Sequence, residues 1–504
     1  MSSPSPSPSN QRTMSKELAP LAINPRAKST ARRRQVGGRS SSRSQPHLIA
    51  AVDLDEIEEH PATIGRGSVA AAVVLFGLVF LQAAFLAVHI KALSPYDEGA
   101  NYDYVIRAMH GSLPIPAGTH YLDTTIQAWA CRPTDKATSL AGICGRPTPP
   151  AYGGVPFEGV NYNAQFGPLY YLIAAGGARA LSVIGIGSFT AARLVSALLY
   201  AAGSAALLLV TQRLKRGWVG PAGLILAASM SGLALSSGAT ITPDSTAFLY
   251  TAGVVASALL ARSWARAVGW TAVLMTLAGL TKPNFIVVAV LASALLLLRW
   301  VYIERPSRTG LSVRSHLSAL IWVCFPVVTC AVSGGAWSAL SRSRAQPGAS
   351  FDGGVHLYLQ SSLGPVARVA QQVAALVQPN GGTAPGAAFT ALDSSLVKTG
   401  GLIVVIATMG ASLWSWLGPD GTSFKPVIVL RSTALAIPVA AIALTVTFYV
   451  FYDGSLQTAS RYGLPFLAAT AIGAGVMIRR KAAPFVALFG AAMWIGVFVA
   501  VLRA

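Results

Sequence analysis

The sequence predicts an all-α polytopic membrane protein, and two observations carry that prediction. The 504 residues are 53% hydrophobic and only 11% charged, whereas a soluble chain carries about a quarter charged residues. Long apolar runs also recur along most of the chain, each near the roughly 20 residues that cross a bilayer as a helix. The net charge of +20 is therefore expected to mark cytoplasmic loops and attraction to anionic membrane lipids, and nucleic acid is not an expected partner.

The first segment, residues 1–66, is predicted to be a disordered basic tail in the cytoplasm. Its first fifty residues repeat Ser-Pro and contain many basic residues but a single acid, Glu17. A segment of this composition cannot bury a core. No apolar run begins until about residue 68, which is too far along the chain for an ordinary cleavable signal peptide.

The remaining domain, 67–504, is expected to contain about eleven transmembrane helices. The predicted spans are 68–92, 187–211, 218–238, 244–261, 267–282, 284–300, 317–340, 400–417, 432–452, 462–478 and 482–502. A further apolar segment, 166–184, contains a proline, several glycines and an arginine. We interpret it as a helix that lies along, or re-enters, the outer face of the membrane.

The distribution of basic residues decides how the segment 166–184 is counted. If it does not cross, the basic stretches QRLKRGW, RSWARA, FKPVIVLR and RRK all fall on the cytoplasmic side together with the N-terminus, as the positive-inside rule requires. If it crosses, all of them fall outside. The first reading places the long loops 93–186 and 341–399 on the outer face. High Ala, Gly and Arg content suggests a bacterial plasma membrane.

The cysteines form two pairs with different expectations. Cys131 and Cys144 lie in the first long outer loop, in a compartment where disulfides persist, and we predict that they are bonded to each other. Cys324 and Cys330 lie inside an apolar segment and are interpreted as small core residues. No spacing typical of a metal site is visible.

The acidic segment SPYDEGANYDYV directly follows the first span and is the main candidate site. Its Asp97 and Glu98 could be solvated interfacial acids, but outer-face cations are expected at Lys282 and Arg461. A carboxylate and a cation that face one cavity suit a reaction in which a base takes a proton from an acceptor hydroxyl and a cation holds a phosphate leaving group.

Several motifs resemble a known superfamily. YDEGANYDY resembles the Asp-Glu pair in the first outer loop of protein O-mannosyltransferases and other GT-C membrane glycosyltransferases, and QFGPLYYLIAA resembles the helix that follows that loop. ITPDSTAF, GLTKPNF and SRYGLPFLA are similar to motifs of the bacterial family called domain of unknown function 2142, which is often described as GT-C-like. The resemblance covers roughly residues 68 to 502. One departure is Asn101, which stands where related sequences often show a His.

The resemblance implies a GT-C-like fold and an activity. A sugar would pass from a polyprenyl-phosphate donor in the outer leaflet to an envelope glycan, lipid or protein, with inversion at the anomeric carbon. By position, Asp97 would be the general base, and Glu98 would orient the acceptor or a bound cation. No cofactor is certain, although an acid pair can also belong to a divalent-cation site.

Other site residues are predicted with an alternative beside each. Lys282 and Arg461 could bind the donor phosphate or extend to the interface. Arg193, inside a span, is costly enough to need a partner, either one of the acids or a lipid phosphate. Asp244 could cap a helix or belong to the substrate cavity. The expected cavity also includes Tyr96, Asn101, Tyr102, Tyr170 and Tyr171, of which the last two could instead belong to an interfacial aromatic belt.

Two other functions remain open. A flippase or transporter would show intramembrane charge pairs or broken helices in two matching halves, and no internal repeat is visible. A non-catalytic envelope-assembly protein is the third possibility. If Asp97, Lys282 and Arg461 meet in one cavity, an enzyme or a sugar-lipid binder is favoured; if they point to separate surfaces, the non-catalytic protein is favoured.

Overall fold

The computed structural model divides into two compact units, Met1–Glu58 and Glu59–Ala504. All the residues it describes belong to the second unit: 64–94, 97–132, 142–146, 155, 159–214, 217–305, 313–345, 364–377, 392, 394–417, 425–452 and 459–503. Most of the predicted tail, and the predicted cavity residue Tyr96, therefore lie outside the described residues.

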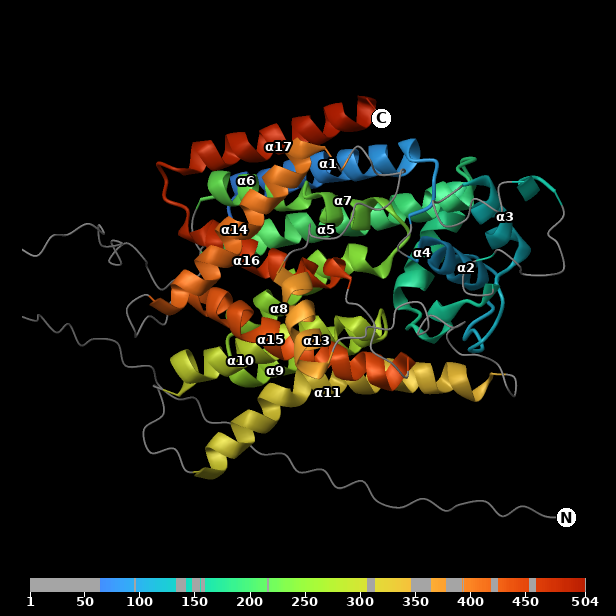
Figure 1. The fold of residues 1–504 in the computed structure, drawn as a ribbon. Helices are drawn as coiled ribbons and strands as arrows, with labels where there is room; N and C mark the ends of the chain where they lie inside the picture. The colour runs from blue at the N-terminus through green and yellow to red at the C-terminus, as the bar shows by residue number, and fades with distance from the viewer. Residues whose placement is uncertain are drawn as a thin grey trace, which may run out of the picture. The chain divides into compact units, whose positions relative to one another are not determined.

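The described chain is built from helices, as predicted (Figure 1). It contains no β-strand among these residues, only an isolated bridge between His120 and Val160. Seven of the described helices are long and apolar enough to cross a membrane, and the count becomes eight if one bent pair is a single span. The seven are α1 (Arg66–His89), α5 (Ser188–Leu214), α10 (Ile286–Arg299) with its flanking turns, α11 (Val313–Ser343), α14 (Ser395–Leu417), α15 (Lys425–Tyr452) and α17 (Ala483–Arg503). The chain is thus a multi-pass helical membrane protein.

The expected number of eleven spans stays a prediction, because four predicted spans are shorter or broken. The segment 218–238 forms α6 (Val219–Ser229) and α7 (Gly232–Ala239), which meet at an angle of 73°. The other three form α8 (Ala247–Leu260), α9 (Trp264–Gly279) and α16 (Leu464–Met477), with 14, 16 and 14 residues. At 1.5 Å per residue these helices are about 21 to 24 Å long, less than the roughly 30 Å of a hydrocarbon core.

Short 3-10 turns precede three of the helices, and two of these, α8 and α16, are shorter than their predicted apolar runs because a turn takes up the start of the run. The turns are η5 (Pro243–Thr246) before α8, η6 (Pro283–Phe285) before α10 and η9 (Ser460–Gly463) before α16. Proline occupies the first position of η5 and η6, where its missing N–H costs nothing. Each turn carries or adjoins a charged residue, so polar groups replace the end of the apolar helix.

The first long loop is itself structured. It contains α2 (Glu98–Met109), α3 (Asp123–Cys131), the 3-10 turn η4 (Tyr162–Gln165) and α4 (Leu169–Ser182). Figure 1 shows α2 and α3 together at one end of the long helices; we call this the α2 end. The non-spanning segment predicted at 166–184 corresponds to α4. The second loop, 341–399, contributes α13 (Pro365–Val377) to the described residues.

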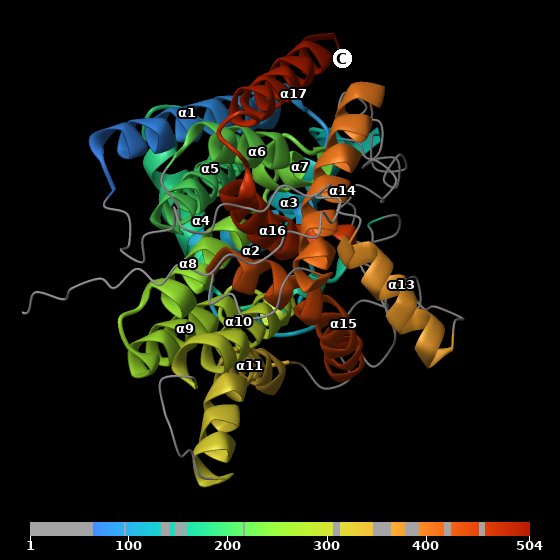
Figure 2. The same cartoon turned by 90° about the vertical axis from the view of Figure 1, so that its left-hand side faces the viewer.

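Close helix packing positions the elements around the site. In Figure 2, which looks along many of the helices, α16 lies in the middle of the described unit, and most of its residues are buried. At the edge, α6 and α17 approach closely because glycines face each other: a Cβ added to Gly490 would lie 2.3 Å from the carbonyl oxygen of Gly223. Small residues commonly permit such contact between membrane helices. α11 is bent (Figure 1) and contains Pro326, which removes a backbone donor.

Candidate functional site

Asp97 begins α2 in an uncommon backbone conformation. Its φ of 62° lies in the left-handed region, and its side chain makes no capping bond to the helix. Aspartate tolerates this conformation better than most residues. The carboxylate is instead turned to two distant partners: it accepts a hydrogen bond of 2.6 Å from the Tyr162 hydroxyl and pairs with the guanidinium of Arg461. The Asp97 carboxylate therefore does not cap α2 and contacts Tyr162 and Arg461 instead.

Asp97 belongs to a group of four charged side chains. Arg461 Nε lies 3.1 Å from Asp244 Oδ2, and Lys282 Nζ donates to both oxygens of Asp244 at 2.9 and 3.0 Å. We call Asp97, Asp244, Lys282 and Arg461 the charge cluster. Two acids balance two cations, which is how buried charge is tolerated.

The cluster is buried except at one member. Lys282 and Asp244 are 1% and 3% exposed, whereas the Asp97 side chain is 26% exposed. Lys282 Nζ also lies 5.0 Å from the centre of the Tyr462 ring, within the range of a cation–π contact. Asp97, Lys282 and Arg461 thus meet in one cluster and do not point to separate surfaces.

The charges of the cluster act on the pKa of Asp97. Burial by itself would raise the pKa of this carboxyl group. The positive charges of Arg461 and Lys282, with the hydrogen bond from Tyr162, outweigh burial and hold the pKa below its usual value of 3.8. Asp97 is consequently ionised throughout the physiological pH range.

Asp244 does not cap a helix. The capping residue of η5 is Thr242, whose hydroxyl accepts from the Asp244 backbone N–H. The capping prediction for Asp244 is therefore wrong, because its carboxylate faces Lys282 and Arg461. Its neighbour in the chain supplies the cap with a hydroxyl, which leaves the carboxylate for the cluster.

Glu98 and Arg193 form a separate, fully buried pair. The Arg193 Nε and Nη2 groups each donate at 2.7 Å to a different oxygen of Glu98. Glu98 also accepts from the backbone N–H groups of Ser94 (2.7 Å) and Ile241 (2.9 Å). The two acids next to each other in sequence thus face different partners.

The pair gives Arg193 one of the partners expected from the sequence, an acid next to the first span. Besides Glu98, its guanidinium donates to the carbonyl oxygens of Ala87, Ile90 and Ala92 at the end of α1. The partner that a buried arginine requires is Glu98, and the guanidinium ties α5 to α1. Both carboxylate oxygens of Glu98 likewise have hydrogen-bond partners, and the site roles expected of Glu98 and Arg193 stay predictions.

The predicted aromatic and amide residues divide among three places. Asn101 accepts from the Tyr171 hydroxyl at 2.7 Å and donates to the Ile241 carbonyl at 2.8 Å, which makes both part of a buried network. Tyr102 bonds to Ser188 Oγ at 2.9 Å. Tyr170 bonds to a serine of α5 at 2.7 Å and lines the groove described next.

An apolar groove of about 480 Å³ runs between α4, α5, α8 and α9. Its lining is almost entirely apolar, and includes Ile173, Leu209, Ala256 and Leu274. Thr246 and Thr281 also line it, and both are close in sequence to members of the charge cluster: Thr281 directly precedes Lys282. One end of the groove therefore adjoins the cluster.

Sequence reasoning missed several residues at this site. Tyr162 holds Asp97, and Asn284 donates to the Tyr462 hydroxyl at 2.7 Å. The buried Tyr121 hydroxyl and the Asn284 amide oxygen have no hydrogen-bond partner among the described residues. The run of amides in NYNAQ, just before the recognised QFGPLYY motif, was the available signal for Tyr162.

No group of three or more His, Cys, Asp or Glu side chains that could hold a metal ion is found in the described part of the chain. The acid pair considered for a divalent cation is divided between two guanidinium partners.

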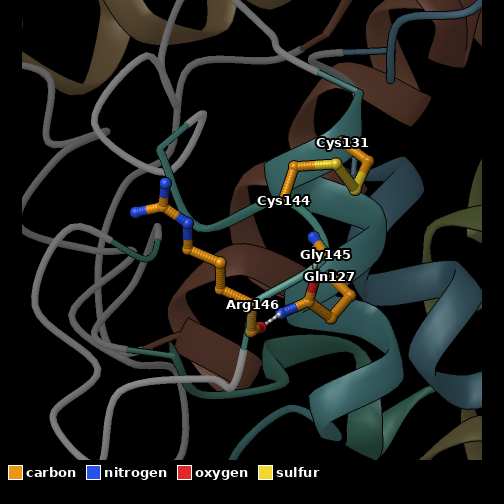
Figure 3. Close-up of a disulfide and its surroundings, with 5 residues drawn as sticks. All are labelled: Gln127, Cys131, Cys144, Gly145 and Arg146. Atoms are coloured by element: carbon orange, nitrogen blue, oxygen red, sulfur yellow. Dashed lines mark hydrogen bonds between the residues drawn. A yellow bond between two sulfur atoms is a disulfide. The ribbon is translucent and has the colours of Figure 1, made fainter.

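The predicted disulfide is confirmed (Figure 3): Cys131 and Cys144 are bonded, with their Cα atoms 4.8 Å apart. The side chain of Gln127 holds the same turn, since it accepts from Gly145 N at 3.0 Å and donates to the Arg146 carbonyl at 2.6 Å. The bond ties the end of α3 to the turn at residues 142–146.

No protein-family model and no curated protein sequence matches the chain. Among solved structures, it is similar to ArnT from Cupriavidus metallidurans bound to undecaprenyl phosphate, with 17% identity, a TM-score of 0.48, and coverage of 85% of this chain and 76% of ArnT. The same protein in the apo state matches with 17% identity, a TM-score of 0.35 and coverage of 84% and 77%. Because the likeness is this distant, the function is inferred from the residues of this chain.

Proposed function

We propose that this protein is a membrane glycosyltransferase of the GT-C type. It takes a sugar from a polyprenyl-phosphate donor and transfers it to an envelope acceptor at the outer face of a bacterial plasma membrane. One observation carries the proposal: a buried cluster with two cations, Lys282 and Arg461, adjoins one end of an apolar groove. This combination matches a ligand with a charged head and a hydrocarbon tail.

The groove suits the tail of such a donor. Its walls offer almost no polar atoms, and an apolar chain gains free energy by leaving water for such a surface. The groove is open between helices that the membrane would surround, so a long polyprenyl chain could continue into the lipid. A donor phosphate would then lie near Thr281 and Lys282, and charge-assisted hydrogen bonds from a lysine and an arginine are among the stronger contacts to phosphate.

The reaction assigned to the cluster is a single displacement. Asp97 takes the proton of an acceptor hydroxyl, and the hydroxyl oxygen forms a bond to the anomeric carbon. The bond from that carbon to the phosphate oxygen breaks, and the electron pair leaves with the polyprenyl phosphate. Lys282 and Arg461 stabilise the charge that develops on the leaving phosphate. Attack opposite to the leaving group inverts the anomeric carbon.

Two features support Asp97 as the base. It is the most exposed carboxylate of the cluster, at 26%, so an acceptor can reach it. A donor phosphate would also compete for Arg461, its ion-pair partner, and would loosen the pairing that weakens Asp97 as a base. Nearby, the Tyr121 hydroxyl and the Asn284 amide oxygen have no hydrogen-bond partner within the described part of the chain. They are suited to sugar hydroxyls, because buried polar groups normally have a partner.

The test is an assay in reconstituted membranes with a panel of polyprenyl-phosphate sugars. Asp97→Asn is expected to lower transfer about 10²- to 10⁴-fold, with binding of the polyprenyl phosphate retained. The matched control is Asp123→Asn, an exposed acid at the start of α3, which should transfer like wild type. Ala256→Trp, which fills the groove, should weaken binding of the lipid itself. Full transfer by the Asp97 variant would reject the assigned base.

A second candidate is a non-catalytic binder of polyprenyl-phosphate lipids. The observation that favours it is that both carboxylates of the cluster are already paired with cations. It predicts lipid binding that depends on Lys282 and on the groove, with no transfer from any donor in the panel. The same experiment therefore separates the two functions.

A further inference from the structure

A second pocket, of about 290 Å³, lies on another side of α2 from the charge cluster. It lies between α3 and the start of α5, beside the disulfide. Its lining is mixed polar and apolar and includes Tyr102, Thr124, Gln127, Arg132, Phe189 and Thr190. Tyr102 is only five residues after Asp97 on α2, but its hydroxyl faces Ser188. The two sites therefore share a helix and use different faces of it.

Arg132 is the charged group of this pocket. Its guanidinium carbon lies 4.3 Å from the centre of the Phe189 ring, so stacking holds it in place. It makes no hydrogen bond or ion pair with another residue in the part of the chain that the structure describes. Burial, and then the positive charge of Arg193, lower the pKa of this guanidinium. The negative charge of Glu98 offsets this lowering only in part, and a further negative charge in the pocket would raise the pKa of Arg132.

Comparison with Arg193 shows what Arg132 lacks. The Arg193 guanidinium lies over the same Phe189 ring, at 4.6 Å, but Glu98 neutralises it with two hydrogen bonds. Arg132 has no such carboxylate among the described residues, although it lines a cavity that has room for one. A guanidinium presents a rigid fork of donors that fits the paired oxygens of a carboxylate or a phosphate.

The chain on the N-terminal side of Arg132 is held by a disulfide. The preceding residue, Cys131, is bonded to Cys144, and Gln127 clamps the backbone of Gly145 and Arg146 (Figure 3). On the opposite wall, α5 begins at Ser188, and the first N–H groups of a helix favour negative charge. A pre-organised site of this kind binds without first ordering its own side chains.

We propose that this pocket binds an oxyanion: the phosphate or carboxylate of a headgroup about the size of one sugar unit. The volume lies just below the usual range of small-molecule pockets, about 300–1,000 Å³, which fits one such unit. The group could belong to a soluble sugar or to the headgroup of an anionic lipid, and the shared chemistry is the oxyanion that Arg132 holds. The inference does not depend on transferase activity, because it concerns binding alone.

The experiment measures binding by the full-length protein in nanodiscs without any polyprenyl donor. Calorimetric titrations use glycerol 1-phosphate and glucuronate as soluble probes. In a third arm, native mass spectrometry counts the phosphatidylglycerol molecules retained from phosphatidylcholine discs that contain this lipid. Arg132→Gln removes the charge, and Arg132→Lys keeps the charge but not the fork. Arg146→Gln removes an exposed charge from the neighbouring turn, which the disulfide joins to α3 and which does not line the pocket.

Wild type is expected to bind at least one probe, and Arg132→Gln to weaken that binding about tenfold or more. Arg132→Lys should fall in between, and Arg146→Gln should bind like wild type. The arm that shows Arg132-dependent binding identifies the source of the oxyanion. The proposal is overturned if no probe binds, or if the Arg132 and Arg146 variants behave alike. If Arg132→Gln does not fold, Arg132→Lys is the deciding variant. If Arg132→Lys binds the probe as well as wild type does, recognition by the guanidinium fork is contradicted.

Discussion

The buried pair of Glu98 and Arg193 gives the sharpest prediction about stability. The side chains are 0% and 1% exposed, and the perturbation is Arg193→Met. This change removes two charge-assisted hydrogen bonds from Glu98 and leaves its carboxylate buried with only two backbone N–H donors. It also removes the donors to three carbonyl oxygens at the end of α1.

The magnitude follows from the uncompensated charge. Breaking a buried ion pair by removing one partner costs about 3–5 kcal/mol of the free energy of unfolding. Glu98→Met should cost a similar amount, since it leaves the guanidinium of Arg193 without its counter-charge. In the double variant no unpaired charge remains. The sum of the two single costs should therefore exceed the cost of the double variant by at least about 2 kcal/mol.

The assay uses a buried thiol of the protein as its reporter. Cys330 is buried and Cys324 is exposed, and neither is in a disulfide, so a Cys324→Ser background leaves one thiol that reacts only on unfolding. Denaturant titrations of the full chain then give the free energies of unfolding. The matched control is Arg179→Met, an exposed arginine of α4, which should lie within about 0.5 kcal/mol of wild type.

Two results would refute the reasoning. Arg193→Met could unfold at the same denaturant concentration as the Arg179 control, which would mean that the pair contributes nothing. Alternatively, the double variant could lose the full sum of the two single costs, which would mean that the two side chains act independently.

Three further predictions concern the site and its surroundings. Asp97→Asn should be less stable than wild type at neutral pH. The difference should persist as the pH falls and vanish only below the usual pKa of 3.8, because a lowered folded-state pKa gives stability that is lost when the carboxylate protonates. Unfolding curves between about pH 7 and pH 3 check this. Gly167→Ala should reduce lipid binding, because the new Cβ would lie 1.9 Å from the carbonyl oxygen of Leu280, two residues before Lys282, whereas Gly176→Ala, with nothing within 4 Å, should be neutral; lipid titrations of both variants measure the difference. Reducing the disulfide, whose cysteines are 13 residues apart, should lower the free energy of unfolding by about 3 kcal/mol, as measured by titrations with and without reductant.

Much of the fold could be predicted because apolar length is a local property. The runs that became α1, α5, α11 and α17 needed only a count of consecutive apolar residues. The bend between α6 and α7 could not be found in this way, since the residues on both sides of Ser231 are mostly apolar or small. Polar breaks at 237–245, 281–284 and 452–463 predict turns where η5, η6 and η9 occur, but the sequence does not show that their backbone is 3-10.

Most charged residues of the candidate site could be predicted from the sequence, but which of them pair with each other could not. Asp97, Lys282 and Arg461 were recognised from motifs and from the cost of charge near a bilayer. That Glu98 would pair with Arg193, 95 residues away, was one of several options, and only the packing of α5 against α1 decides it. Tyr162 could hardly be predicted, because its acid partner, Asp97, lies 65 residues away and no repeating pattern connects the two.

The division of the two neighbouring acids affects how the protein is made. The ion-pair partner of Glu98 leaves the ribosome 95 residues later, whereas the ion-pair partner of Asp97 comes 364 residues later. During synthesis, the Glu98–Arg193 ion pair can therefore form early. The charge cluster of Lys282 and the two aspartates is complete only after η9, the turn that precedes α16, has been made. A chain that stops before this turn would contain the early helices but lack Arg461, so its charge cluster would have two acids and one cation. Only a nearly full-length chain can therefore complete the cluster.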